Sequence, residues 1–378
     1  MKAPSLHLTN HYTYRDIFAA YMSCRRAKRN TRSQIAFEIR FERNLAELLE
    51  EVNSGAYRIG PSRVFVVTRP KPREVWAAQF RDRIIHHLIY NSIGSWFEAR
   101  FIEDTYSCIP GRGTLAASRR FETFCRRATG NWAREAYALK VDIRSFFVSI
   151  NRAILWETFR ESIGEDSLTA RLVRQNVYHD PTVGAVVAPQ TRLDLVPPHK
   201  SLWTASRRGC GLAIGNHTSQ FSSNVYLDGL DQYVKHTLKA RWYVRYVDDA
   251  VLLSHDRDEL AGWCAAIDGW LRTHRALSLH PDKIHIGPLS QGVEFVGRLV
   301  LPYRTYTRKM TAHAAKQAAR RLRKHPADDK AMCSVNSYLG LLRQADTYNL
   351  RSVICRRVCF PLITGTDENC NKVRKLWK

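Results

Sequence analysis

The chain has 378 residues, 44% of them hydrophobic and 25% charged, a composition typical of globular proteins with two or three hydrophobic cores. Its 59 Lys and Arg residues against 35 Asp and Glu residues give a formal charge of +24, which predicts a polyanionic partner, either nucleic acid or a membrane surface. No apolar run is long enough to span a bilayer, and the N-terminus lacks the apolar core of a signal peptide, so we expect a cytoplasmic protein without a membrane partner.

The nine cysteines are scattered along the chain, and no two have the Cys-x-x-Cys spacing of a zinc or redox site. We therefore expect reduced thiols that act mostly as small packing residues.

Residues 1–60 are predicted to form a basic, helical N-terminal extension. Apolar residues recur at helical spacing after Asp16 and again over residues 41–52, and Gly55 supplies a stop signal. Between the two helices lies a cationic cluster, either a solvated helix face or an RNA contact, made of Arg25, Arg26, Lys28 and Arg29.

A strand is predicted over residues 63–68, followed by a turn whose two prolines stiffen it and prevent a regular ladder. The turn displays Lys71 and Arg73 as rigid cations of the kind that a triphosphate requires, although a generic basic turn has the same pattern. A Gly-rich loop over residues 104–114 contains Arg112, and we expect it to contact a nucleic-acid backbone.

The segment 138–141 has the pattern of a buried strand and ends at the acid Asp142. A carboxylate in that position is costly unless it binds a cation; a helix N-cap or a salt bridge would also explain it. The bulky ring of Phe147, soon after, is suited to form the floor of a nucleotide pocket.

Residues 179–210 contain several prolines and little periodicity, which indicates a long loop or insertion. From Gly211, glycines and small polar residues open a helix that continues to about Leu238. Its N-terminus offers free N–H groups, and its small residues let a base pair approach the backbone; ordinary capping by Ser or Thr is the alternative.

Two short apolar runs, 242–244 and 250–253, flank the adjacent acids Asp248 and Asp249. Their β-branched and aromatic residues predict strands on both sides. Two adjacent carboxylates would repel each other in a buried ladder, so we place them at the tip of a β-hairpin, where they face either a divalent cation or only water.

Beyond this hairpin, a turn carrying Lys283 precedes a strand, and residues 293–300 form a further strand pair. From Ala312 the pattern is helical and very basic, which makes it a candidate RNA-binding segment through Lys316, Arg320, Arg321 and Arg323.

Taken together, these stretches resemble the reverse transcriptases, in family order over residues 60–345. Residues 142–147 resemble the first catalytic motif, 211–224 the template–primer motif and Tyr246-Val-Asp-Asp249 the second acidic motif. The resemblance implies an α+β right-hand polymerase fold with an antiparallel-sheet palm. The implied parts are fingers over 61–136, a palm over 137–300 that includes the 179–210 insertion, and a basic helical thumb and tail over 301–378.

The resemblance also implies an RNA-directed DNA polymerase that uses dNTPs and two Mg²⁺ ions, or Mn²⁺ in their place. Lys283 would protonate the leaving pyrophosphate, and Phe147 would be a steric gate against a 2′-OH. The implied metal ligands are Asp142, Ile143, Asp248 and Asp249, and the implied nucleotide-binding residues are Lys71, Arg73, Phe147, Ile214, Gly215 and Gln220. A primer-grip hairpin would add nucleic-acid contacts from Phe295 and Gly297.

Two departures from the usual template–primer motif indicate a particular branch of the reverse transcriptases. Ile214 stands where most reverse transcriptases carry Gln, and Ser219-Gln220 replaces Ser-Pro. These residues, with residues 336–340 and 346–351, resemble the enzymes of diversity-generating retroelements and of bacterial antiphage-defence systems. Because the Gln amide near the incoming nucleotide is lost, we expect lower fidelity.

Either role implies a dedicated structured RNA from the same locus, acting as template, scaffold or primer. An accessory protein, a second polymerase or another copy of the chain would be the protein partner. The long 179–210 insertion adds weight to the defence role, and both roles stay open. Two rival functions also remain: a template-independent DNA polymer synthase on the same fold, and a non-catalytic RNA-binding protein with a retained palm.

Overall fold

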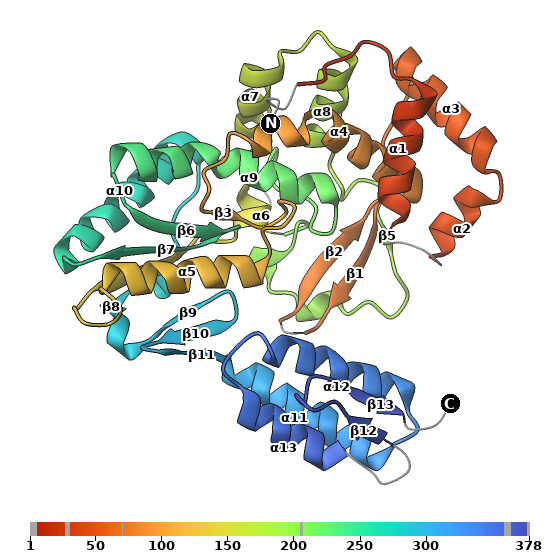
Figure 1. Ribbon diagram of the computed structural model, residues 1–378. Helices are drawn as coiled ribbons and strands as arrows, with labels where there is room; N and C mark the ends of the chain where they lie inside the picture. Colours follow the sequence, from red (N-terminus) through yellow and green to blue (C-terminus); the bar gives the residue numbers. More distant parts are fainter. Residues whose placement is uncertain (1–5, 27–30, 70, 205–206, 359–363, 376–378) are drawn as a thin grey trace. The chain divides into compact units, whose positions relative to one another are not determined.

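The computed structural model describes residues 6–26, 31–69, 71–204, 207–358 and 364–375 (Figure 1). They belong to two compact units, each built from three stretches of the chain. The predicted division into an extension, fingers, palm and thumb stays a prediction. No described helix is long and apolar enough to cross a membrane, and the described cysteines are free thiols. Unit 1 comprises Met1–Pro110, Val141–Lys239 and Trp263–Ile284, and unit 2 comprises Gly111–Lys140, Ala240–Gly262 and His285–Lys378.

The N-terminal part of unit 1 is helical, as predicted. α1 begins with a capping box in which the side chains of Thr13 and Asp16 each accept a hydrogen bond from the other residue's backbone N–H. α3 ends at Gly55, whose φ of +76° provides a left-handed cap. The buried face of α1 packs against the largely buried α4. These helices span Tyr14–Arg25 (α1), Arg32–Glu38 (α2), Phe41–Ser54 (α3) and Phe80–Glu98 (α4).

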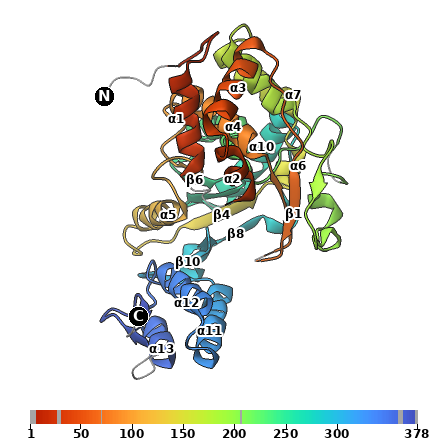
Figure 2. The ribbon, with the colours of Figure 1, turned by 90° about the vertical axis from the view of Figure 1, so that its right-hand side faces the viewer.

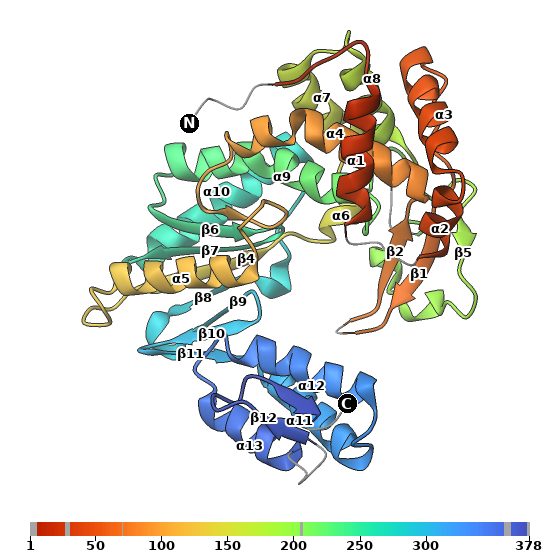
Figure 3. The ribbon, with the colours of Figure 1, turned by 45° about the vertical axis from the view of Figure 1, so that its right-hand side comes forward.

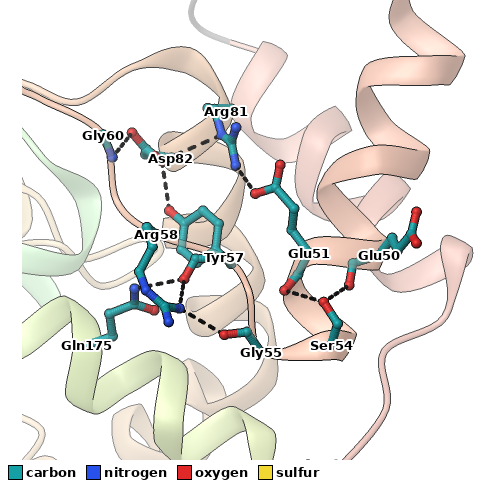
Figure 4. A network of polar contacts seen from close by, with 10 residues as sticks. All are labelled: Glu50, Glu51, Ser54, Gly55, Tyr57, Arg58, Gly60, Arg81, Asp82 and Gln175. Carbon is teal, nitrogen blue, oxygen red and sulfur yellow. Dashed lines mark hydrogen bonds and ion pairs between the residues drawn. The ribbon is translucent and has the colours of Figure 1, made fainter.

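A buried carboxylate anchors the segment between α3 and α4 (Figure 4). Asp82 is fully buried and accepts hydrogen bonds from the Tyr57 hydroxyl at 2.8 Å and from the Gly60 N–H at 3.2 Å. Its neighbour Arg81 forms an ion pair with Glu51 of α3. Burial raises the pKa of the Asp82 carboxyl, because the charged form loses hydration.

Unit 1 also contains a three-stranded sheet built from β1 (Arg63–Val67), β2 (Arg73–Ala77) and β5 (Val186–Val187). β1 and β2 form an antiparallel hairpin in which Val67 pairs with Arg73. Figure 3 shows β5, which comes from the predicted insertion, alongside β1 in parallel orientation. The rest of the insertion is irregular apart from two short 3₁₀ helices, Leu193–Leu195 (η1) and Pro198–Lys200 (η2).

The centre of unit 1 is α9 (His217–Gln232), which continues as a π-helical turn over Tyr233–Thr237. Its buried residues pack against α4 and α7, which explains why a sequence rich in Ser and Asn still forms a core helix. The remaining elements of the unit are β3 (Thr105–Tyr106), α6 (Phe146–Ser149), α7 (Arg152–Ile163), α8 (Leu168–Tyr178) and η4 (Pro281–Lys283). α10 (Arg257–Arg275) begins in unit 2 and ends in unit 1.

Unit 2 is built on a sheet with the strand order β6-β7-β4-β8, in which β6 with β7 and β4 with β8 form antiparallel pairs, and α5 packs against β6 and β7. A second sheet has the order β11-β10-β9, of which β11 was not expected from the sequence. The bounds are Thr114–Ala128 (α5), Tyr137–Asp142 (β4), Trp242–Tyr246 (β6), Asp249–Ser254 (β7), His285–Pro288 (β8), Leu289–Gln291 (η5), Val293–Phe295 (β9), Arg298–Leu301 (β10) and Arg304–Thr307 (β11).

The C-terminal part of unit 2 is a helical cluster with its own alanine-rich and leucine-rich core. Figure 2 shows α11 (Lys309–Lys324) beside α12 (Asp329–Leu342) and α13 (Tyr348–Val358). A terminal hairpin of β12 (Thr364–Thr366) and β13 (Val373–Lys375) follows, which the sequence pattern did not predict.

Candidate active site

The two adjacent acids lie at the turn of a tight β-hairpin, as predicted. Tyr246 of β6 pairs with Asp249 of β7, which leaves only Val247 and Asp248 in the turn. Val247 has a φ of +57°, the sign required at the first central position of a two-residue hairpin turn, where glycine is usual. A β-branched residue in this conformation is strained, and such strain is typical of functional sites.

The hairpin is held by charged side chains within unit 2. The Arg245 guanidinium, which is 1% exposed, donates a hydrogen bond of 2.9 Å to the Val247 carbonyl. Lys140 Nζ lies 3.8 Å from Asp249 Oδ2 and also donates to the Glu294 carbonyl at 2.7 Å. Asp249 therefore lies beside the Lys140 ammonium group. The buried Arg245 side chain stabilises the strained turn through its hydrogen bond to Val247.

The third predicted acid, Asp142, ends β4 and has a lysine beside it. Lys283 Nζ lies 2.6 Å from Asp142 Oδ1. The salt bridge that was the alternative to cation binding by Asp142 is therefore present. Its partner, Lys283, is the lysine that the resemblance implies as the proton donor. The Asp142 main-chain carbonyl accepts a hydrogen bond from the His280 N–H at 2.8 Å. This hydrogen bond holds the 280–283 turn beside the C-terminal end of β4, within unit 1.

Ile143 follows Asp142 in a narrow antiparallel bridge with Leu279. The hydrogen bonds on either side of this bridge, His280 N–H to Asp142 O and Arg144 N–H to Ser278 O, make it a non-hydrogen-bonded pair. The N–H and carbonyl of Ile143 therefore point away from the 278–280 segment. This orientation suits a main-chain oxygen ligand.

The loop that carries the predicted nucleotide-binding residues Ile214 and Gly215 is hydrogen-bonded to the backbone of the β2 region. The Trp76 N–H in β2 donates to the Ile214 carbonyl at 2.8 Å, and the Ala78 N–H donates to Asn216 Oδ1 at 3.2 Å. Gly215 lies between these bonds with a φ of +118°, and a Cβ there would be 2.8 Å from Val75 Cγ1. Only glycine permits this approach.

The predicted steric gate, Phe147, is hydrogen-bonded to the segment that leads into the same loop. Phe147 is half-buried on α6, and its ring contacts that of the buried Phe146 at 5.3 Å between centroids. Its carbonyl accepts a hydrogen bond of 2.8 Å from the Leu212 N–H, which links the gate to the Ile214 loop. Lys71 and Arg73 are exposed on the β1–β2 hairpin, as the stiff turn predicted.

Residues 69–300, more than half of the chain, match the family model of the reverse transcriptases, described as RNA-dependent DNA polymerases. The chain belongs to this family. The predicted α+β right-hand polymerase fold is thereby confirmed, and RNA-directed DNA polymerase is the activity that describes the matched family.

Two telomerase structures are similar to this reverse transcriptase. Telomerase from Candida albicans, solved with a fragment of telomeric RNA, is 8% identical with a TM-score of 0.48, over 85% of this chain and 60% of that chain. Apo telomerase from Candida tropicalis, truncated from its C-terminal domain, is 13% identical with a TM-score of 0.44, over 68% of this chain and 59% of that chain. The chain thus matches about three fifths of the length of each telomerase. A search of curated proteins found no match.

The reverse transcriptase carboxylates belong to different units, Asp142 to unit 1 and Asp248 with Asp249 to unit 2. Among the described residues, no three His, Cys, Asp or Glu side chains are grouped as metal ligands. The donors themselves, carboxylates and the carbonyl of Ile143, suit hard divalent cations such as Mg²⁺ or Mn²⁺. The lysines beside Asp142 and Asp249 show that both carboxylates accept a neighbouring positive charge. Metal ligation by these residues stays a prediction.

The residues that resemble the template–primer motif also contact the Gly-rich loop, a pairing that their local sequence does not reveal. The exposed Gln220 accepts a hydrogen bond from Cys108 Sγ at 3.1 Å, and Asn224 Nδ2 donates to the Ser107 carbonyl at 2.8 Å. Ser107 and Cys108 have φ values of 90° and 54°, so α9 holds a strained turn of the Gly-rich loop in place. Burial raises the pKa of the Cys108 thiol, which favours its role as a hydrogen-bond donor.

The prediction that Phe295 contacts nucleic acid is wrong for its side chain. The ring is fully buried and packs against Phe121 of α5, with 5.5 Å between centroids. Phe295 instead anchors a two-residue turn to the core of unit 2. In that turn Val296 and Gly297 both have positive φ, the pattern of a type I′ hairpin.

The predicted RNA-binding clusters differ in how accessible their cations are. Arg25 forms an ion pair with Glu38 at 2.7 Å, Arg26 is exposed, and Lys28 and Arg29 lie outside the described residues. Arg112 is half-buried. On α11, the predicted cations Lys316, Arg320, Arg321 and Arg323 are all exposed, and a groove of about 300 Å³ is lined by Gln317, Arg320, Arg321, Lys324 and His325.

Proposed function

We propose that this reverse transcriptase copies a dedicated structured RNA into DNA by two-metal nucleotidyl transfer. The observation that carries the proposal is the strained two-residue turn, in which Arg245 supports Val247 and the chain presents Asp248 and Asp249 together. A purely structural acidic turn would not need a β-branched residue at positive φ. Asp142 is the third carboxylate of the proposed site, and Ile143 supplies a carbonyl.

In the proposed reaction, a 3′-OH loses its proton to solvent and attacks the α-phosphate of a dNTP, an O–P bond forms, and the bond to pyrophosphate breaks. Mg²⁺ ions would stabilise the entering and leaving oxygens. Lys283 would donate a proton to the leaving pyrophosphate, since its amine is held beside Asp142. Lys71 and Arg73 would bind the triphosphate. The half-buried ring of Phe147 would exclude a 2′-OH, which favours DNA as the product.

We further propose a role in a diversity-generating retroelement or in antiphage defence. Ile214 and Ser219-Gln220 support this branch, and the insertion over residues 179–210 adds weight to defence. The partner would be a structured non-coding RNA, held in part by the exposed cations of α11. An accessory protein, a second polymerase or a second copy of the chain would complete the assembly.

The test is nucleotide incorporation by the purified protein on a primed RNA with Mg²⁺, with each dNTP alone and with all four. We expect templated DNA synthesis that is lost in the double variant Asp248→Ala and Asp249→Ala. Synthesis that survives this double substitution would overturn the proposed site. Synthesis that persists after co-purifying RNA is removed, with no template supplied, would favour a template-independent polymer synthase instead.

RNA binding without any incorporation would favour a non-catalytic RNA-binding protein. Sequencing of the nucleic acid that co-purifies with the chain identifies the template RNA. A single abundant RNA species that also appears as complementary DNA is the expected result, whereas a random sample of cellular RNA would contradict a dedicated template.

A further inference from the structure

The second half of the insertion is docked on β2, directly beside the predicted triphosphate-binding hairpin. The Leu202 N–H donates to Glu74 Oε2 at 3.0 Å, and the Trp76 indole N–H donates to the same oxygen at 3.2 Å. Glu74 is only 3% exposed, and the Trp76 and Trp203 rings lie 4.6 Å apart. The buried Glu74 carboxylate accepts both hydrogen bonds and so holds the insertion against β2. Arg73 is the residue before Glu74 in this strand.

The backbone that carries Lys200 is held by local hydrogen bonds. Lys200 ends the short helix η2, which begins at Pro198, and its N–H donates to the Pro197 carbonyl at 2.8 Å. The Thr204 hydroxyl donates to the Pro198 carbonyl at 2.7 Å and closes the same loop. Lys200 itself is exposed, so a held main chain presents a cation that is accessible to a ligand.

Lys200 lies among charged groups that belong to three other parts of unit 1. Its pKa is lowered, first by desolvation and then by repulsion from Lys283, Lys71 and Arg73, while Asp142 opposes the shift. Four cations from the β1–β2 hairpin, the insertion and the 281–283 turn therefore lie within electrostatic range of one another. Such crowding is unfavourable in the free protein and is relieved when a compact polyanion binds.

We propose that Lys200 is a nucleotide-binding residue, through which the insertion contacts the phosphates of the incoming dNTP and of the leaving pyrophosphate. The inference rests on the proposed polymerase function and adds a residue to its site. A triphosphate concentrates several negative charges within a few ångströms, whereas a nucleic-acid backbone spreads them along its length. The convergence of the four cations near Asp142 therefore fits a nucleotide better than RNA.

The test compares Lys200→Ala, Lys200→Arg and wild type in steady-state incorporation at saturating primed RNA. We expect the KM for dNTP and the inhibition constant of pyrophosphate to rise about fivefold in Lys200→Ala, with kcat within about twofold of wild type. Lys200→Arg, which keeps the charge, should stay close to wild type. The matched control is Arg192→Gln, because Arg192 is an exposed cation of the same insertion, paired with Asp194 at 2.6 Å.

An unchanged KM in Lys200→Ala, or an equal rise in Arg192→Gln, would overturn the proposal. Weaker binding of the primed RNA with an unchanged KM for dNTP would overturn it too, in favour of a nucleic-acid contact. Calorimetric titration of dTTP with Mg²⁺ into the full chain separates the two hypotheses. If wild type incorporates no nucleotide, the proposed polymerase function fails. The role of Lys200 in nucleotide binding is then decided by the titration alone: weaker dTTP binding by Lys200→Ala supports it, and binding equal to that of wild type rejects it.

Discussion

Lys283 Nζ lies 2.6 Å from Asp142 Oδ1, at the end of strand β4. The pair joins the predicted proton donor to the predicted metal ligand within unit 1. The hydrogen bond from the His280 N–H to the Asp142 carbonyl fixes the turn that carries Lys283. The backbone, and not only the flexible lysine side chain, therefore positions Lys283 Nζ beside Asp142.

We expect Lys283→Met to lower kcat by about 10²-fold, because the leaving pyrophosphate loses its proton donor. Lys283→Arg should recover only part of the rate, since Arg keeps the charge but does not give up its proton. Single-turnover incorporation, with the pH profile of the rate, is the measurement. A kcat for Lys283→Met that equals that of wild type would show that another group protonates pyrophosphate.

Gly215→Ala should disturb the proposed nucleotide site. An added Cβ would be 2.8 Å from Val75 Cγ1, in a backbone with a φ of +118°. We expect a loss of roughly 1–3 kcal/mol in the free energy of unfolding, together with a raised KM for dNTP. Gly209→Ala is the matched control, because Gly209 also has a positive φ of +80° but open space around it. Equal losses in the two variants would show that strain, and not the contact with β2, decides the effect.

Ile214→Gln should change fidelity. The Ile214 main chain is fixed by the bond to the Trp76 N–H, so a new side chain would enter a loop of unchanged position. We expect fewer misincorporated nucleotides on a homopolymer RNA template, since the amide restores a hydrogen-bonding group near the incoming nucleotide. The misincorporation spectrum of each variant is the readout. An identical spectrum would remove Ile214 as the cause of low fidelity.

Asp82→Asn should alter how stability depends on pH. Burial raises the pKa of Asp82 above its ordinary value of 3.8, so the folded state holds this proton more tightly than the unfolded chain. The stability of wild type relative to the variant is therefore greatest below about pH 4 and falls as pH rises through the folded pKa. Denaturant unfolding at pH 4 and pH 7 measures this difference, and a difference that grows with pH would contradict it.

The exposed cations of α11 should account for part of the salt dependence of RNA binding. We expect Arg320→Gln with Arg323→Gln to reduce the slope of log K against log salt by about 1.5 to 2. Arg160→Gln with Arg272→Gln is a charge-matched control, because both arginines are paired with acids on their own helices. If the two double variants have equal slopes, α11 does not contact the phosphate backbone.

Much of the local structure around the candidate site could be predicted from residue types and spacing, because it depends on neighbouring residues in the chain. Two acids between apolar strands require a hairpin tip, and a cation on a proline-stiffened turn stays exposed. The helical N-terminal segment, the irregular insertion and the basic α11 also follow from local patterns. By contrast, the burial of Phe295 depends on Phe121 of α5, a residue far away in sequence.

The sequence by itself determined the family, the acidic hairpin and the strand that ends at Asp142, since motif order and hydrophobic patterns are properties of the linear chain. Only the tertiary structure decided which lysine lies beside Asp142, why Gly215 must be glycine, and where the insertion docks. The reason is that these contacts join segments whose pairing is set by packing. Glu74 and Leu202 have nothing in their local sequence to mark them as partners, yet their buried hydrogen bond holds the segment that follows Lys200 against β2.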